Sequence, residues 1–200
     1  MFGKNKTISL KERTNNLIEQ VDGAPFKKKS MLDIPKGYVA ILIESDGTSE
    51  IIRDTHQYKL DRDVHAIFYA KANALVQTTK WGTRSRVPIK TKAGEAKSLG
   101  AFGTLTFKLV NPLRYINKKM GTDQDVKPEA LKNMVIEKIT DVLHDVVHTY
   151  GTIELEDKAF LPSLKKDVTE ALAIYLDDYG IKIDDFIIEK LNTTPSSQEG

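Results

Sequence analysis

The stretch Gly100–Pro112, with the sequence GAFGTLTFKLVNP, contains the change of pattern that decides the fold class. Leu105, Phe107 and Leu109 alternate with polar neighbours, as expected for a strand with one buried face. The two glycines of the stretch indicate a bulge or a close approach of backbone. After Pro112 the apolar residues recur at three- and four-residue steps, which is typical of helices. The chain therefore changes from strands to helices at about residue 112.

Strand patterns precede this stretch from Ile34 onward. Tyr38–Ile43 is an apolar run rich in strand-forming residues, and Asp46-Gly47 is typical of a tight hairpin turn, because glycine accepts a positive φ. The other strands that we expect are Thr48–Arg53, Tyr58–Leu60, His65–Lys71, Leu75–Lys80, Arg86–Thr91 and Ala101–Leu109.

Helical patterns follow, beginning with a short helix over Pro112–Lys119. A long helix opens at Pro128 and ends at Gly151, and a second runs over Asp157–Tyr179. Ile181–Leu191 resembles a closing strand. The expected core-facing stripes are Leu131, Val135, Ile139, Val142, Val146 and Tyr150 in the first long helix, and Leu161, Leu164, Val168, Leu172, Tyr175 and Leu176 in the second.

This order predicts an α+β fold, with a mostly antiparallel, β-rich half followed by two long helices and a closing strand. Three parts are expected: a basic N-terminal segment (1–33), the folded domain (34–191) and a polar tail (192–200). Within the first part, Leu10–Val21 has a thin apolar stripe that predicts a short helix.

Composition restricts the class of protein. The chain has no cysteine, which excludes disulfides, thiolate metal sites and a cysteine nucleophile. It has no run approaching the roughly 18 apolar residues of a membrane-spanning helix. Met1–Lys6 is followed by no apolar run, so it does not resemble a secretory signal. We expect a cytoplasmic protein.

Charge is distributed unevenly along the chain. Residues 1–120 carry 22 Lys and Arg against 11 Asp and Glu, whereas residues 121–200 carry 8 against 17. Such a division indicates a surface for an oppositely charged partner. In one interpretation the basic half of one copy contacts the acidic half of the next, head to tail. In the other, the two halves pair inside one monomer.

Four segments carry a resemblance to a known superfamily, and they are, in order, Ile34–Ile41, Trp81-Gly82-Thr83 with Pro88-Ile89, Gly100–Pro112 and Ile181–Ile188. Together they resemble the SPFH (band 7) superfamily of stomatins, prohibitins and flotillins, most closely its bacterial virion-core-protein-like subgroup. The likeness covers about residues 34–191 and implies a non-catalytic scaffold that assembles with copies of itself near membranes. Members usually also carry an N-terminal anchor and a C-terminal coiled coil, and neither pattern is present in these residues.

Enzyme motifs are weak in this sequence. His144 and His148 lie four residues apart, as in the His-Glu-x-x-His zinc proteases, but Asp145 stands where the general base would be glutamate. A third ligand would have to come from Glu154 or Glu156. The alternative is that both histidines make ordinary hydrogen bonds. We therefore expect no enzyme, no catalytic residue, no cofactor and no metal, with a metal-dependent hydrolase as the third hypothesis.

The most basic surface segment is Lys80–Lys92. It could contact another copy or an anionic membrane, or bind single-stranded nucleic acid by phosphate contacts and base stacking. Alternatively, Trp81 is in the core and the charges lie on a solvated face. The predicted contact residues are Lys80, Trp81, Arg84, Arg86, Lys90 and Lys92.

A second basic group lies near the N-terminus. An amphipathic basic segment can bind weakly and reversibly to anionic lipid. We expect a homo-oligomer first, then an anionic membrane surface or a membrane protein as partner, at the inner face of the membrane; nucleic acid ranks below these. The predicted membrane contacts are Phe2, Lys4, Lys6, Lys27, Lys28 and Lys29.

Overall fold

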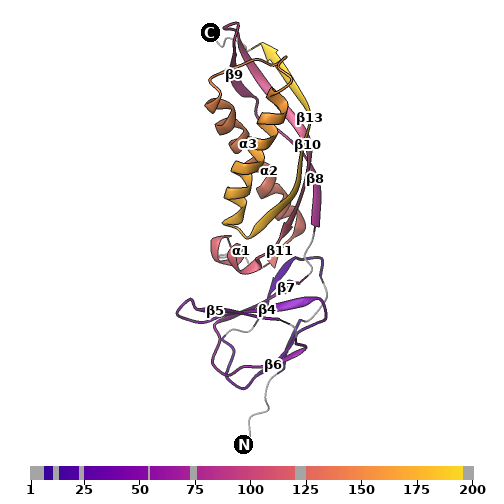
Figure 1. Cartoon of the computed structure of the whole chain (residues 1–200). Helices are drawn as coiled ribbons and strands as arrows, with labels where there is room; N and C mark the ends of the chain where they lie inside the picture. The colour runs from indigo at the N-terminus through magenta and orange to yellow at the C-terminus, as the bar shows by residue number, and fades with distance from the viewer. Residues whose placement is uncertain are drawn as a thin grey trace, which may run out of the picture. The chain divides into compact units, whose positions relative to one another are not determined.

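The computed structural model describes residues 7–10, 14–22, 25–53, 55–72, 76–119 and 125–195. The chain divides into two compact units (Figure 1). Unit 1 comprises Met1–Leu75 and Asn111–Pro128, and unit 2 comprises Val76–Val110 and Glu129–Gly200.

Unit 1 contains two sheets and one short helix. One sheet has the strand order β11-β2-β7-β4-β5 and is antiparallel; the other has the order β1-β3-β6, in which β1 and β3 are parallel. The elements are β1 (Thr7–Ser9), β2 (Ile18–Gln20), β3 (Met31–Asp33), β4 (Tyr38–Ile43), β5 (Ser49–Ile52), β6 (Gln57–Lys59), β7 (Ala66–Lys71), α1 (Pro112–Lys119) and β11 (Asp125–Val126).

The two sheets of unit 1 share one apolar core. Leu32 from β3 and Leu42 from β4 belong to the same buried cluster. Tyr69 from β7 is also buried there, and its hydroxyl donates a hydrogen bond to the carbonyl oxygen of Asp33 at 2.9 Å. This bond satisfies the polar end of a side chain that is otherwise packed among apolar residues. Burial raises the pKa of Tyr69 well above its ordinary value.

Unit 2 is built around one long strand pair. β10 pairs with β13 from Lys97 to Leu109, and its other edge pairs first with β9 and then with β8. All these pairings are antiparallel, and β12 adds to β9 in parallel. The elements are β8 (Val76–Gly82), β9 (Val87–Thr91), β10 (Ala96–Leu109), α2 (Pro128–Thr149), β12 (Thr152–Ile153), α3 (Phe160–Asp177) and β13 (Ile181–Pro195).

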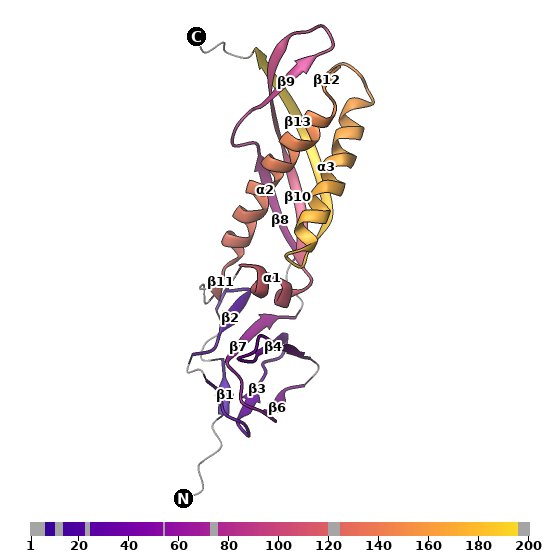
Figure 2. The ribbon, with the colours of Figure 1, turned by 90° about the vertical axis from the view of Figure 1, so that its left-hand side faces the viewer.

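One face of this sheet is covered by helices. Figure 2 shows α2 and α3 side by side in front of β8, β10 and β13. Side chains alternate along a strand, so β10 directs every second residue toward the helices. The buried residues of this core include Leu105 and Phe107 of β10, Leu131, Val135, Ile139 and Leu143 of α2, and Leu164, Val168, Leu172 and Leu176 of α3.

The predicted fold class is confirmed, as are the long helices and most of the strands. Gly47, Gly151 and Gly180 have φ values of 86°, 67° and 68°, which are the left-handed conformations that the predicted hairpin turn and helix ends require. Gly121, the predicted end of α1, lies outside the described residues. The boundary at residues 33/34 stays a prediction.

Three local predictions are wrong. The expected helix at Leu10–Val21 contains strand β2, because residues 18–20 pair with β7 and β11 and so gain neighbours on both sides. Leu161 is exposed. The buried residues of α3 begin with Phe160 and recur at steps of four, so Leu161 lies outside this line. The expected tail from Asn192 begins as strand, because β13 continues to Pro195 against β10.

The predicted close approach of backbone at the glycine-containing strand is confirmed, and it lies opposite a bulge in β13. Phe102 pairs with Lys190 and Gly103 pairs with Ile188, so Glu189 is an extra residue in β13. The bulge brings backbone against backbone: a Cβ on Gly103 would lie 1.9 Å from the carbonyl oxygen of Ile187. Only glycine fits at this position without moving β13.

We predict that Gly103→Ala destabilises unit 2 by about 1–3 kcal/mol, the usual cost of forcing extra volume into a packed site. Urea unfolding followed by circular dichroism measures the change. Gly82→Ala is the matched control, since a Cβ there would make an ordinary contact at 3.7 Å with the Cβ of Phe102. Equal stability of the two variants would contradict the steric argument.

Candidate interaction surface

Trp81 is in the core of unit 2. Its side chain is 4% exposed, and its ring stacks on Phe186 with centroids 5.0 Å apart. Trp81 pairs with Gly103 in the β8–β10 ladder, and strand alternation directs it to the same covered face as Phe186. Trp81 is therefore not part of a contact surface, and the alternative that places it in the core is confirmed. An exposed tryptophan for base stacking is absent.

Two cations of the predicted segment are already paired within unit 2. Arg84 Nη1 lies 2.7 Å from Glu137 Oε1 of α2, and Lys92 Nζ lies 2.6 Å from Glu154 Oε2. The Glu154 carboxylate raises the pKa of Lys92 by accepting its hydrogen bond and by its charge. Both pairs are exposed, so each contributes little to stability.

These ion pairs also bear on the uneven distribution of basic and acidic residues along the chain. Lys108 of β10 forms a third ion pair of this kind, with Asp184 of β13 at 2.9 Å. Each pair joins a basic residue before position 120 to an acidic residue after it. Part of the division is therefore compensated inside one unit, as the monomer interpretation predicted.

The remaining cations of the segment are Lys80, Arg86 and Lys90. No ion pair joins any of them to another residue that the structure describes. Lys80 lies opposite Thr104 in the register of the β8–β10 ladder. Nη1 of Arg86 lies 3.7 Å from the position that a Cβ on Gly100 would occupy. Lys90 is exposed on β9.

The uncovered face of the sheet carries two exposed apolar side chains. Phe102 is 40% exposed and Ile187 is 39% exposed. Phe102 lies between Gly82 and Lys190 in the ladders, and Ile187 lies opposite Thr104. Residues opposite one another in an antiparallel ladder point to the same face. We call this set the outer-face patch: Lys80, Arg86, Phe102, Ile187 and Lys190.

Two acidic residues of β13 are engaged with β10, whereas Asp185, which lies opposite Thr106 on this face, is exposed. Glu189 and Asp184 are the two extra residues at the bulges of β13. The Thr104 hydroxyl donates a hydrogen bond to Glu189 at 2.5 Å, and Lys108 binds Asp184. The outer-face patch therefore combines an apolar centre with a rim of three cations, and the carboxylate of Asp185 lies beside it on the same face.

Sequence reasoning missed Phe102, although a signal was present. Leu105, Phe107 and Leu109 occupy the odd positions of an alternating strand, so Phe102 falls on the opposite face. No comparable signal identifies Ile187, because the bulges of β13 change its alternation.

His144 and His148 do share one face of α2, as their spacing predicted. Their rings meet edge to face with centroids 4.4 Å apart, and Nδ1 of His144 lies 3.6 Å from Oδ1 of Asp145. Glu154, one expected third ligand, is bound to Lys92. Within the described ranges there is no group of three or more His, Cys, Asp or Glu able to hold a metal ion.

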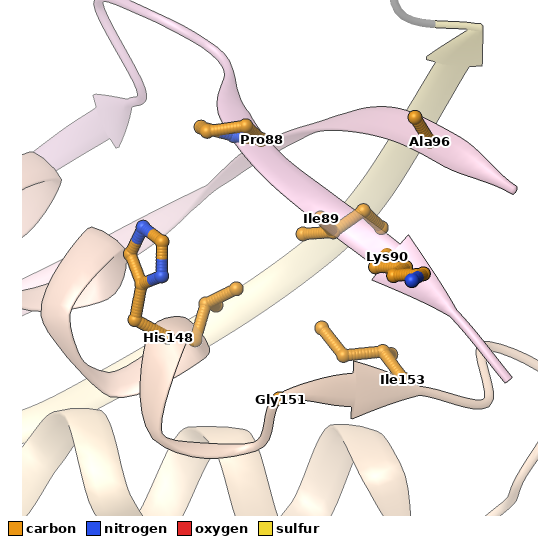
Figure 3. A pocket seen from close by; sticks show the side chains of 8 residues that line it. Pro88, Ile89, Lys90, Ala96, His148, Gly151 and Ile153 are labelled. Atoms are coloured by element: carbon orange, nitrogen blue, oxygen red, sulfur yellow. The ribbon is translucent and has the colours of Figure 1, made fainter. Parts of the chain in front are cut away.

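A shallow hollow of about 250 Å³ lies beside His148, between β9 and the end of α2 (Figure 3). Ile89, Val147 and Ile153 give it an apolar lining, and Lys90 and His148 are its two basic members. The described residues that line it include no carboxylate and no hydroxyl group.

The predicted N-terminal contacts are described only in part. Phe2, Lys4 and Lys6 lie outside the described residues. Lys27–Lys29 form an exposed turn of unit 1, in which Lys27 Nζ binds Asp63 Oδ2 at 2.9 Å. None of the helices in the described part of the chain has the length and apolar composition needed to cross a membrane.

Comparison with known families gives one match. The model of the SPFH domain-Band 7 family matches residues 54–198, which is more than half of the chain. The match agrees with the resemblance inferred from the sequence, whereas the virion-core-protein-like subgroup stays a prediction. None of the curated proteins compared with the chain matches it.

The burial of Trp81 can be tested by fluorescence, because the chain has a single tryptophan. We predict a blue-shifted emission and weak quenching by iodide in the folded protein, since the indole is shielded from water and ions. Unfolding in urea should shift the emission to the red and increase quenching several-fold. Equal quenching of the folded and unfolded chains would place Trp81 on the surface.

Proposed function

Because this chain belongs to the SPFH domain-Band 7 family, we propose that it is a non-catalytic scaffold that self-associates and attaches peripherally to an anionic membrane. Family membership is consistent with a scaffold-like role. The observation that carries the proposal is the outer-face patch.

The composition of the patch suits a protein contact. Interfaces commonly have an apolar centre and a polar rim. Here Phe102 and Ile187 provide the centre, and Lys80, Arg86 and Lys190 provide the rim. These three cations have no ion-pair partner among the described residues, so a partner with carboxylates could bind them without breaking an existing pair.

A nucleic-acid-binding role is less well supported by the same residues. The aromatic residue expected to stack on bases is buried, and Arg84 and Lys92 are paired with carboxylates. Single-stranded nucleic acid binding depends on exposed aromatic platforms and on cations that follow the backbone.

Attachment to membranes is proposed to use the N-terminal part of the chain. Lys28 and Lys29 are exposed in the turn before β3, and each basic residue near anionic lipid contributes about 1 kcal/mol. Phe2, Lys4 and Lys6 would add an apolar residue and two charges. Such a contact is weak and reversible, which suits a peripheral protein.

We predict that light scattering gives a mass above the 22.5 kDa of one chain at low salt. The mass should fall as salt rises, because the cationic rim is screened over a Debye length of about 8 Å at physiological ionic strength. Phe102→Ser with Ile187→Ser should give monomers at all salt concentrations.

Val110→Ser is the matched control for this test, since Val110 is an exposed apolar residue of unit 2 outside the outer-face patch. It should associate like the unaltered chain. A monomer at both low and high salt would exclude self-association.

We predict that the chain sediments with vesicles containing phosphatidylserine and not with neutral vesicles. Lys28→Glu with Lys29→Glu should reduce the bound fraction at least tenfold, since two attractive charges become repulsive. Lys165→Glu with Lys166→Glu, a neighbouring pair of exposed lysines on α3, is the control and should bind normally. Binding to a single-stranded oligonucleotide instead of vesicles would favour the nucleic-acid alternative.

A further inference from the structure

The outer side of α3 carries the most exposed large apolar residue in the described part of the chain. Ile174 is 76% exposed. On a helix, residues three and four positions apart are neighbours. The neighbours of Ile174 at these positions are Glu170, Ala171, Asp177 and Asp178, so three of the four are acidic. Glu170 has only a distant ion-pair contact, with Lys166 at 4.0 Å.

This arrangement is the electrostatic complement of the outer-face patch. On α3, an exposed apolar side chain lies among carboxylates; on the sheet, two exposed apolar side chains lie among cations. Apolar groups would meet in the centre of such a contact, and opposite charges would meet at its rim.

We propose that the outer-face patch of one copy binds the outer side of α3, centred on Ile174, in the next copy. The inference rests on the proposed self-association and specifies which surfaces form it. In this proposal the partner that binds the exposed sheet face is a second copy of this chain.

The sign of the charges determines the symmetry of the contact. In a two-fold dimer centred on either patch, that patch would meet itself, so cations would face cations on the sheet, or carboxylates would face carboxylates on α3. Like charges placed together across an interface disfavour binding. A contact between two different patches avoids this repulsion.

The position of the two patches permits such a contact to repeat. Helices α2 and α3 cover one face of the sheet (Figures 1 and 2), and the ladder register places the outer-face patch on the other. α3 therefore presents Ile174 on the side of unit 2 that faces away from the patch. A copy bound at one face leaves its own second face available. Contacts between different patches produce rings when the rotation closes and filaments when it does not.

The absence of cysteine allows a direct test by site-specific cross-linking. Two variants are prepared, Ile174→Cys and Ile187→Cys, with tags of different mass, and are mixed and treated with a short bismaleimide. We expect the mixed 174–187 product to exceed both like-with-like products at least fivefold. Val110→Cys is the control for a reactive but uninvolved thiol, and should give no product with Ile174→Cys above background.

The outcomes separate this inference from the proposed function. Light scattering of the unaltered chain reports self-association itself, and a monomer would overturn both. Association without the mixed product, or with 174–174 or 187–187 products equally abundant, would overturn the pairing of surfaces and leave self-association standing.

A charge exchange provides a second measurement that does not depend on cysteine chemistry. Glu170→Lys or Lys190→Glu alone should weaken association about fivefold, the effect of one rim ion pair. Combined in one chain, the two changes should restore association, since opposite charges face each other again. Circular dichroism verifies that each variant is folded. Failure of the double variant to exceed the single variants would contradict the proposed contact.

Discussion

The ladder between β10 and β13 is the interaction on which the rest of unit 2 depends. It joins Lys97–Leu109 to the last strand, with the two long helices between them in the chain. Closing such a long loop costs conformational entropy. The free energy gained from backbone hydrogen bonds and from burial of apolar surface must exceed this cost. Once it forms, strand alternation assigns Phe107 and Phe186 to the core and Phe102 and Ile187 to the opposite face.

The bulges of this ladder connect the fold to the candidate surface. Each adds one acidic residue to β13, and each of these residues binds a side chain of β10. Two of the nearby carboxylates are thereby engaged, whereas Lys80 and Arg86 have no ion pair within the described residues. The close approach at Gly103 is the steric condition for the first bulge. One local irregularity thus contributes both to packing and to the charge of the exposed face.

Much of the fold could be predicted because its signals are local. The spacing of apolar residues in α2, the glycine at its end and the alternation in β10 are each read within a few residues. The failures were at Leu10–Val21 and at the end of β13, where the conformation depends on distant strands. A short segment with a thin apolar stripe has no strong preference of its own, so the pairing available in the fold decides its conformation.

The sequence by itself determined the α+β class, the family likeness, the order of the elements and the chemistry available to the chain, because these depend on composition and short-range spacing. Only the tertiary structure decided which members of Lys80–Lys92 are buried or paired within the chain. Trp81 is buried because helices cover its face of the sheet. Arg84 and Lys92 are paired with residues 53 and 62 positions away. Phe102 is exposed because it lies on the face of the sheet away from α2 and α3, which no described helix covers. No local pattern specifies which face of a sheet its helices will occupy.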